Sequence, residues 1–216
     1  MIVILLGPPG VGKGTQGKIL CEALGLSHLS TGDLLRAARR EGTELGQQAQ
    51  AFMDRGELVP DGVIVGRVRE KLEELGPDAG VVFDGFPRTV PQAEALDRAL
   101  LDIARKVDRV IVMTADDAVL VRRISGRRSC SSCGTIYNVF TSPPAQEGAC
   151  DTCGSELTHR KDDAPETVQN RREVYRELTE PLVGHYERAP GTPVVTVDGD
   201  QAVDDVQTAL RSAVSR

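Results

Sequence analysis

The stretch Met1-Ile-Val-Ile-Leu-Leu-Gly-Pro-Pro-Gly-Val-Gly-Lys-Gly-Thr15 carries the strongest signal in this chain. It opens with an uninterrupted apolar run over residues 1–6, which is typical of a strand buried in a parallel sheet. In the glycine-rich turn that follows, backbone N–H groups can point inward around phosphate oxygens. Lys13 adds a positive charge, and the next helix aims its N-terminus at the same place. The stretch therefore predicts a phosphate-binding loop, and a nucleoside triphosphate is the first ligand we expect.

The loop departs from the common pattern at one position. Gly14 follows Lys13 where Ser or Thr is usual, and Thr15 comes one residue later. The sequence therefore leaves open which hydroxyl group would meet a magnesium ion.

A second motif overlaps the loop. Gly12-x-Gly14-x-x-Gly17, with Asp33 downstream, formally matches a dinucleotide-binding fingerprint. In such a site the first glycine closes the strand directly, whereas here Gly7 does so. We therefore favour the phosphate loop, both over this fingerprint and over a glycine-rich turn that binds nothing.

Paired cysteines form the next strong signal. Cys130-x-x-Cys133 is followed, after sixteen residues, by Cys150-x-x-Cys153, a spacing typical of a zinc site with four thiolate ligands. Two disulfides are the rival interpretation, and iron or an empty reduced site are further alternatives. The N-terminus lacks the basic leader of a secreted chain, so we favour zinc. Cys21 stands alone and is expected to be a small core residue.

Composition favours one catalytic domain with insertions. The chain has 216 residues, and no segment approaches the ~20 apolar residues that a membrane helix needs. A net charge of −6, no Trp, three Tyr and four Phe argue against general binding to nucleic acid. We therefore expect a soluble cytoplasmic protein in which positive charge acts locally.

Apolar strand-like runs alternate with helix-like stretches along the chain. This alternation predicts an α/β fold with a mostly parallel sheet flanked by helices, like that of phosphate-loop nucleoside triphosphatases. Expected strands cover residues 1–6, 26–30, 80–84, 108–114 and 193–197, and expected helices cover 13–24, 33–40, 45–55, 62–75, 91–103, 116–127, 165–188 and 202–214.

Capping signals mark several of these helices. They include the Ser30 and Asp33 capping box, Asp61 as an N-cap, Pro91 and Pro165 at first helical positions, and Gly25, Gly56 and Gly76 at helix ends.

The segment Phe83-Asp-Gly-Phe-Pro-Arg88 is expected to contribute to the same site as the phosphate loop. It closes an apolar strand, and ligands in open α/β sheets bind at that edge. Asp84 can hold Mg²⁺ through its water shell, and Arg88 can donate two hydrogen bonds to one phosphate.

Further arginines stand at the junctions between the expected core and two segments that break its alternation, 30–59 and 126–163. Arg123 and Arg127 are expected to share one face of a helix. Phosphoryl transfer requires fixed cations of this kind around the transferred group. The others are Arg36, Arg160 and Arg171.

These motifs together resemble the adenylate kinase family, in its form with a long zinc-bearing lid. The resemblance covers essentially the whole chain. It rests on Gly7-Pro-Pro-Gly-Val-Gly-Lys-Gly-Thr-Gln16, Ser30-Thr-Gly-Asp-Leu-Leu-Arg36, Leu58-Val-Pro-Asp61, Phe83-Asp-Gly-Phe-Pro-Arg-Thr89 with Gln92, Arg123-x-x-x-Arg127, the four cysteines, Arg160-Lys-Asp-Asp163 and Arg171.

The resemblance implies reversible, Mg²⁺-dependent phosphoryl transfer from ATP to AMP, giving two ADP, by a chain built in three parts. The core would comprise residues 1–29, 60–125 and 164–216, with a monophosphate-binding insert at 30–59 and a zinc-binding lid at 126–163.

The resemblance also implies roles for individual residues. The transferred phosphoryl group would be surrounded by Lys13, Arg88, Arg123, Arg160 and Arg171. ATP would contact Gly10, Val11, Gly12, Lys13, Gly14, Thr15, Arg127, Ile136, Tyr137 and Gln201. AMP would contact Thr31, Arg36, Glu57, Leu58, Val59, Gly85, Phe86, Pro87, Arg88, Gln92, Arg160 and Arg171. Asp84 and Asp33 would order the waters on Mg²⁺, and Cys130, Cys133, Cys150 and Cys153 would hold a structural Zn²⁺.

Two other functions remain open at this point. One is a sister nucleoside monophosphate kinase with another donor or acceptor base. The other is a zinc-ribbon protein that binds nucleic acid and uses a nucleotide as a switch. We favour the nucleotides ATP, AMP and ADP as partners, with no nucleic acid and no membrane, and a monomer.

Overall fold

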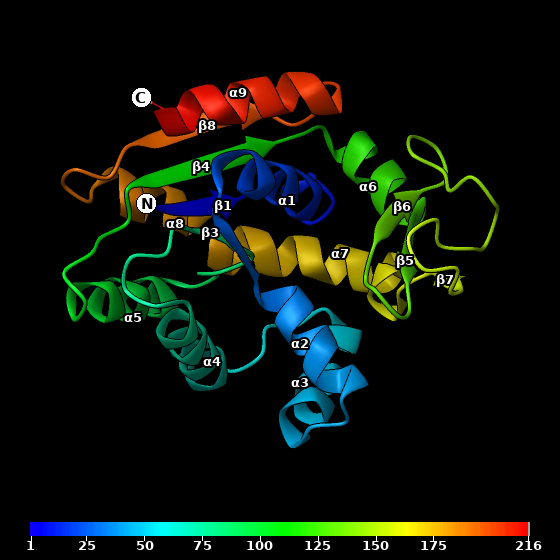
Figure 1. The fold of residues 1–216 in the computed structure, drawn as a ribbon, viewed down its shortest axis with the longest axis horizontal. Coiled ribbons are helices and arrows are strands. Elements are labelled where there is room, and N and C mark those ends of the chain that lie inside the picture. The colour runs from blue at the N-terminus through cyan, green and yellow to red at the C-terminus, as the bar shows by residue number, and fades with distance from the viewer. Residues whose placement is uncertain (216) are drawn as a thin grey trace.

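The computed structural model describes residues 1–215. A five-stranded sheet forms its centre, with all paired strands parallel and the spatial order β2-β3-β1-β4-β8 (Figure 1). Strand β1 lies in the middle, so the loop that follows it opens at the centre of the carboxyl edge. The strands are β1 (Ile2–Leu6), β2 (Ser27–Ser30), β3 (Val81–Asp84), β4 (Arg109–Thr114) and β8 (Val194–Asp198).

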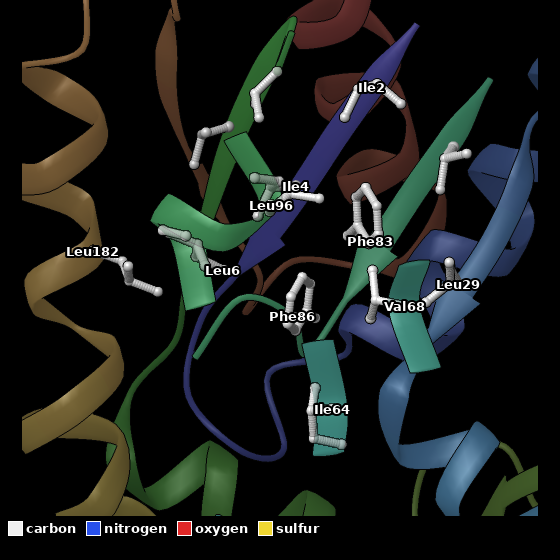
Figure 2. Packing of buried hydrophobic residues seen from close by; sticks show 14 of the residues in the cluster. Ile2, Ile4, Leu6, Leu29, Ile64, Val68, Phe83, Phe86, Leu96 and Leu182 are labelled. Carbon is white, nitrogen blue, oxygen red and sulfur yellow. The ribbon is translucent and has the colours of Figure 1, made fainter. Parts of the chain in front are cut away.

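Strand β1 is apolar throughout because both faces of the sheet are covered. Ile2, Ile4 and Leu6 pack on one face, and Val3 and Leu5 pack on the other. Figure 2 shows the first face from close by. It is covered by α4 (Asp61–Leu75), α5 (Val90–Leu101) and α8 (Pro181–Glu187), and the other face by α1 (Lys13–Leu24), α6 (Asp117–Ser125) and α9 (Val203–Ser215).

Two groups of elements lie outside this sheet. Helices α2 and α3 pack against each other, and a small antiparallel sheet has the order β6-β5-β7 (Figure 1). Helix α3 also contacts α7, where Asn170 Nδ2 donates to Arg55 O at 2.6 Å and Thr167 Oγ1 donates to Asp54 O at 3.3 Å. These elements are α2 (Thr31–Arg40), α3 (Glu44–Arg55), β5 (Arg127–Cys130), β6 (Ile136–Asn138), β7 (Leu157–Thr158) and α7 (Pro165–Val174).

The fold class expected from the sequence is confirmed, and most element boundaries agree within two residues. The capping box at α2 forms, since Ser30 Oγ accepts a hydrogen bond from Asp33 N. Gly25, Gly56 and Gly76 follow the ends of α1, α3 and α4. Over residues 1–215, no helix combines the length and the apolar character needed to cross a membrane.

The expected helix over 116–127 ends early. Helix α6 stops at Ser125, and Arg127 instead begins β5, where it pairs with Asn138. Arg123 and Arg127 therefore do not share a helix face, and that prediction was wrong. The backbone of Gly126 explains the break, because Val139 N donates to Gly126 O and a Cβ on Gly126 would lie 2.5 Å from the Phe140 ring. Packing of the small sheet overrides the local helical pattern.

The single helix expected over 165–188 is also interrupted. Helices α7 and α8 are joined by a π-helical turn over Tyr175–Thr179, in which Glu180 N donates to Tyr175 O at 2.9 Å. Pro181 begins α8 and has no N–H to continue the regular ladder. A widened turn accommodates its ring and keeps the two helices nearly continuous.

Candidate functional site

A large cavity of about 830 Å³ opens at the carboxyl edge of the parallel sheet. Its walls come from the phosphate loop, the end of β3, α2, the small antiparallel sheet and α7. It brings together the sequence-predicted residues Gly10, Val11, Gly12, Lys13, Gly14, Thr15, Asp33, Arg36, Asp84, Arg88, Arg123, Arg127, Ile136, Tyr137, Arg160, Arg171 and Gln201.

The phosphate loop presents backbone donors to this cavity. Gly10 and Gly12 have φ angles of 88° and 109°, which other residues rarely adopt. The N–H groups at the start of α1 have no partner within the helix, and residues 12–15 line the cavity. The loop is therefore shaped to bind an anion at a helix N-terminus.

Lys13 stands inside the loop and not at its rim. Its Nζ donates to Gly7 O at 2.6 Å and to Pro8 O at 3.1 Å. Burial, opposed by the charge of Asp84 and reinforced by the cations Arg88 and Arg171, lowers the pKa of Lys13 from 10.5 to about 8. A phosphate group would offset both the desolvation and the repulsion.

Asp84 lies beside the loop at the end of β3. Burial alone would raise its pKa, but contact with His28 and the charge of Lys13 outweigh burial and lower it. His28 Nε2 lies 3.5 Å from Asp84 Oδ2. A Cβ on Gly14 would lie 3.3 Å from the same oxygen, so a larger residue at this position of the loop would crowd the carboxylate.

Arginines from the small sheet and α7 approach the same cavity and compete for a few acids. Asp163 accepts hydrogen bonds from Arg127, including one from Nε at 2.8 Å, and from Arg171 Nη1 at 3.3 Å. Arg171 Nη1 also donates to Asp162 Oδ2 at 2.9 Å. Burial and then the charge of Arg127 lower the pKa values of both Arg160 and Arg171, although carboxylates lie near them. The cluster is short of negative charge until an anionic ligand enters.

A smaller cavity adjoins the large one. The two share wall residues that include Arg36, Arg88 and Arg171. Apolar residues also line the small cavity, namely Leu35, Met53, Val59 and Ile64, so its walls offer both apolar and cationic groups. The remaining wall residues are Thr31, Gly32, Gly56, Glu57, Leu58, Gly85, Gln92 and Asp162.

The sequence-predicted residues Phe86 and Pro87 are placed differently from their neighbours. Pro87 lines the large cavity. The Phe86 side chain is 1% exposed and packs in the core against Phe83, with 5.9 Å between the ring centroids. Among the described residues that line these two cavities, Phe86 does not appear. Its side chain anchors the segment that carries Arg88.

Three further sequence-predicted residues of the large cavity are Arg123, Ile136 and Gln201. Arg123 Nη1 donates to Val11 O at 3.2 Å and to Gly199 O at 2.8 Å, so it ties the phosphate loop to the turn after β8. Ile136 lies on β6, and Gln201 lies in that turn. The turn that carries Gln201 therefore reaches the same space as the phosphate loop.

The four paired cysteines meet at one point. Their Sγ atoms all lie within 4.8 Å of one another, with Cys130 and Cys153 at 3.4 Å and Cys133 and Cys150 at 3.6 Å. Zinc–sulfur bonds of about 2.3 Å would space tetrahedral ligands about 3.8 Å apart, which these separations match. The donor set is therefore suited to a metal ion without an open coordination position.

Tyr137 links this cluster to the large cavity. Its ring lines the cavity, while its hydroxyl lies 3.5 Å from Cys150 Sγ and accepts a hydrogen bond from Asp151 N at 2.9 Å. Because the Tyr137 oxygen already accepts a hydrogen bond from Asp151 N, the proton of the Tyr137 hydroxyl can be donated to the Cys150 sulfur. Burial opposes ionisation of Cys150, but hydrogen bonds from Tyr137 and from backbone N–H groups outweigh it and lower the pKa of the thiol to about 6.

Comparisons with known proteins agree with this geometry. A sequence model described as "Adenylate kinase" matches residues 5–190. The chain is 47% identical over 216 residues to the adenylate kinase of Methanosarcina acetivorans, covering 100% of this chain and 99% of that protein.

The chain belongs to the adenylate kinase family. It is also 48% identical over 216 residues to the adenylate kinase of Methanothrix thermoacetophila, with coverage of 100% and 99%. Identity to the adenylate kinase of Chloroherpeton thalassium is 50% over 211 residues, with coverage of 97% and 96%. The family expected from the sequence motifs is thus confirmed.

Sequence reasoning missed several residues that position this adenylate kinase family site. Asp162 and Asp163 follow Arg160 closely in the sequence, but only Arg160 was predicted to be a site residue. The two acidic side chains beside a predicted cation were the signal that could have identified them. Ser129 Oγ accepts from Arg160 Nε at 2.7 Å, and Thr179 Oγ1 donates to Arg88 O at 2.9 Å. Nothing in the sequence around these two hydroxyls indicated a role.

The lowered pKa of Lys13 predicts that nucleotide binding is coupled to proton uptake. Because its pKa is about 8 in the free protein, neutral lysine is populated as the pH rises above that value, and a bound phosphate shifts the pKa back toward 10.5. Between these two values, binding of a non-hydrolysable ATP analogue should take up a proton. Calorimetry in buffers of different ionisation enthalpy measures this uptake.

Lys13→Met should abolish the proton uptake, whereas Lys18→Met, at a half-exposed position on the same helix, should leave it intact. Equal uptake by wild type and Lys13→Met would show that another group titrates.

Proposed function

We propose that this chain transfers the terminal phosphoryl group of ATP to AMP, giving two ADP. Its membership of the adenylate kinase family supports this activity. One observation from the structure supports it further. Lys13, Arg88 after β3, Arg123 of α6, Arg127 of β5, Arg160 after β7 and Arg171 of α7 all line a single cavity that adjoins a second, smaller one. Two adjoining sites with cations between them suit a reaction between two nucleotides.

The large cavity takes ATP, and the small cavity together with the adjoining wall of the large one takes AMP. ATP would be held by Gly10, Val11, Gly12, Lys13, Gly14, Thr15, Arg127, Ile136, Tyr137 and Gln201. AMP would be held by Thr31, Arg36, Glu57, Leu58, Val59, Gly85, Pro87, Arg88, Gln92, Arg160 and Arg171, and by the backbone of Phe86.

Positioning and charge neutralisation account for the rate. The phosphate of AMP is already an anionic nucleophile, so no general base is needed. Lys13 and Arg88 are fixed by the sheet, while Arg123, Arg160 and Arg171 close the remaining sides around the transferred group. Charge that develops there meets cations already oriented toward it.

Water competes with AMP for the same phosphoryl group, so the site must exclude it. We assign this task to two movable parts, the insert 30–59 and the lid 126–163, which close on a core of residues 1–29, 60–125 and 164–216. The contact of Asn170 with Arg55 links the insert to α7 of the core. Burial would raise the pKa of Asp33 in the insert, but the charge and hydrogen bond of Arg36, followed by the charges of Lys18 and of Arg160 in the lid, outweigh it and lower the pKa.

The residues at the loop fit a magnesium ion that arrives with ATP. Asp84 keeps its charge despite burial, and Gly14 leaves its oxygen uncovered. Asp84 and Asp33 would hold the ion through its water molecules. When bound, Mg²⁺ neutralises part of the phosphate charge.

The four cysteines fit a structural Zn²⁺. Thiolates at these separations complete a tetrahedron, so the ion would have no site for chemistry. Around the cluster only a small apolar group is buried, formed by Tyr137 and Leu157 with Cys130 and Cys150. The metal would therefore replace a hydrophobic core in the lid.

The activity is tested by a coupled assay for ADP made from ATP and AMP, with and without Mg²⁺. We expect turnover only when both nucleotides and Mg²⁺ are present. Parallel reactions with GMP, CMP or UMP as acceptor test for a sister monophosphate kinase. Faster turnover of one of these acceptors than of AMP would replace the proposed substrate.

Arg88→Ala should lower kcat by at least ~10³, as expected for an arginine that stabilises charge in phosphoryl transfer. The same assay measures this loss. Arg69→Ala serves as the control, because Arg69 is exposed and forms its ion pair with the exposed Asp102, away from both cavities. A normal kcat in Arg88→Ala would remove Arg88 from the reacting centre.

Tyr137→Phe should weaken zinc binding about 10- to 100-fold, because the hydroxyl that contacts the Cys150 sulfur is lost. Competition with a chromogenic chelator gives the affinity independently of turnover. Tyr175→Phe removes a hydroxyl elsewhere in the cavity wall and should leave the zinc affinity unchanged. An unaltered affinity in Tyr137→Phe would mean that the hydroxyl does not support the metal.

A further inference from the structure

Gln92 is held from two sides at the wall of the small cavity. Its side chain is buried, with 2% of the residue exposed. Nε2 donates to Asp61 Oδ1 at 2.6 Å, and Oε1 accepts from Arg88 N at 2.8 Å. Thr89 Oγ1 donates to the second oxygen of Asp61 at 2.9 Å and so fixes the carboxylate. The contact between Asp61 and Gln92 joins the start of α4 to α5.

The sequence had indicated another role for Asp61, that of an N-cap. In the structure α4 begins at Asp61, and Pro60 precedes it as the capping residue. The Asp61 carboxylate turns away from its own helix toward Thr89 and Gln92. Among the described residues that line the two cavities, Asp61 does not appear, so it acts on a ligand through the residues it holds, of which Gln92 lines the small cavity.

These contacts allow one orientation of the Gln92 amide. A carboxylate only accepts hydrogen bonds, and a backbone N–H only donates them. Rotating the amide by half a turn would set its oxygen against Asp61 and its NH₂ group against Arg88 N. Both contacts would become repulsive in a buried place where water cannot replace them. Asp61 and the Arg88 backbone therefore fix which end of the amide is the donor.

The fixed amide keeps one N–H and one oxygen lone pair for a ligand. Adenine offers an acceptor at N1 and a donor at its 6-amino group, whereas hypoxanthine and guanine offer a donor at N1 and an acceptor at O6. A freely rotating glutamine would satisfy either edge by turning over. A glutamine whose amide is fixed presents its donor and its acceptor in one arrangement, and so distinguishes adenine from hypoxanthine and guanine.

We propose that Asp61 is a specificity-determining residue, which selects 6-amino purines in the acceptor site by fixing the orientation of the Gln92 amide. This inference rests on the proposed function, because it takes the small cavity to be the AMP site. The walls of that cavity suit such a ligand, with Leu35, Met53 and Ile64 around the base and arginines around the phosphate. Asp61 is thus a positioning residue outside the cavity.

The test compares AMP with IMP, whose base differs from adenine at the 6 and 1 positions. Asp61→Asn keeps the size of the side chain but offers Gln92 both a donor and an acceptor, so the reversed amide is no longer excluded on that side. We expect the ratio of kcat/KM for AMP to that for IMP to fall by about tenfold or more. The loss should appear mainly in KM for AMP, with kcat little changed.

Asp54→Asn is the matched control. Asp54 also accepts a hydrogen bond from a glutamine, Gln50, but the residue belongs to neither described cavity wall. It should leave the AMP to IMP ratio unchanged. A folded Asp61→Asn protein that keeps the wild-type ratio would overturn the proposal. If wild type itself fails to use AMP, the proposed function fails instead, so the two failures are distinguishable.

A measurement on wild-type protein does not depend on the variant folding. In ¹⁵N-resolved NMR spectra, the side-chain NH₂ of Gln92, assigned by its absence in Gln92→Leu, should show one proton shifted downfield by the carboxylate and slow rotation of the amide. A Gln92 signal that resembles that of an exposed glutamine such as Gln146 would show a free amide and would overturn the proposal.

Discussion

Repulsion among buried cations is the constraint on which this structure depends. Lys13 loses part of its affinity for protons because it is desolvated and faces several arginines. Only a few carboxylates offset this charge within the cavity walls. The free site is therefore under electrostatic strain that an anionic ligand relieves, which is the behaviour expected of a site prepared for phosphate charge. Its cations are Lys13, Arg36, Arg88, Arg123, Arg127, Arg160 and Arg171.

The architecture tolerates this repulsion by bringing the cations from different elements. The apolar sheet holds the phosphate loop and the segment after β3 rigidly, because β1 is buried on both faces. The remaining cations stand on α2, α6, the small sheet and α7, where backbone carbonyls, Ser129 and the acids Asp162 and Asp163 orient them.

Local patterns in the sequence predicted the parts whose partners are near in the chain. The β1 run, the phosphate loop, the Ser30 cap and the glycine ends of helices all follow from contacts over a few residues. The prediction failed where distant packing prevailed. Arg127 left its expected helix because β6 pairs with it, and Pro181 interrupted a helix that its neighbours favour.

The sequence by itself determined the chemistry available to this protein: a loop that binds phosphate, four thiolates with metal spacing, and a supply of arginines. Only the tertiary structure decided how these groups are oriented. Asp61 meets Gln92 across 31 positions of sequence, and Tyr137 meets Cys150 across 13. The physical reason is that residue type fixes whether a group donates, accepts or carries charge, whereas the partner it faces depends on how separate elements pack.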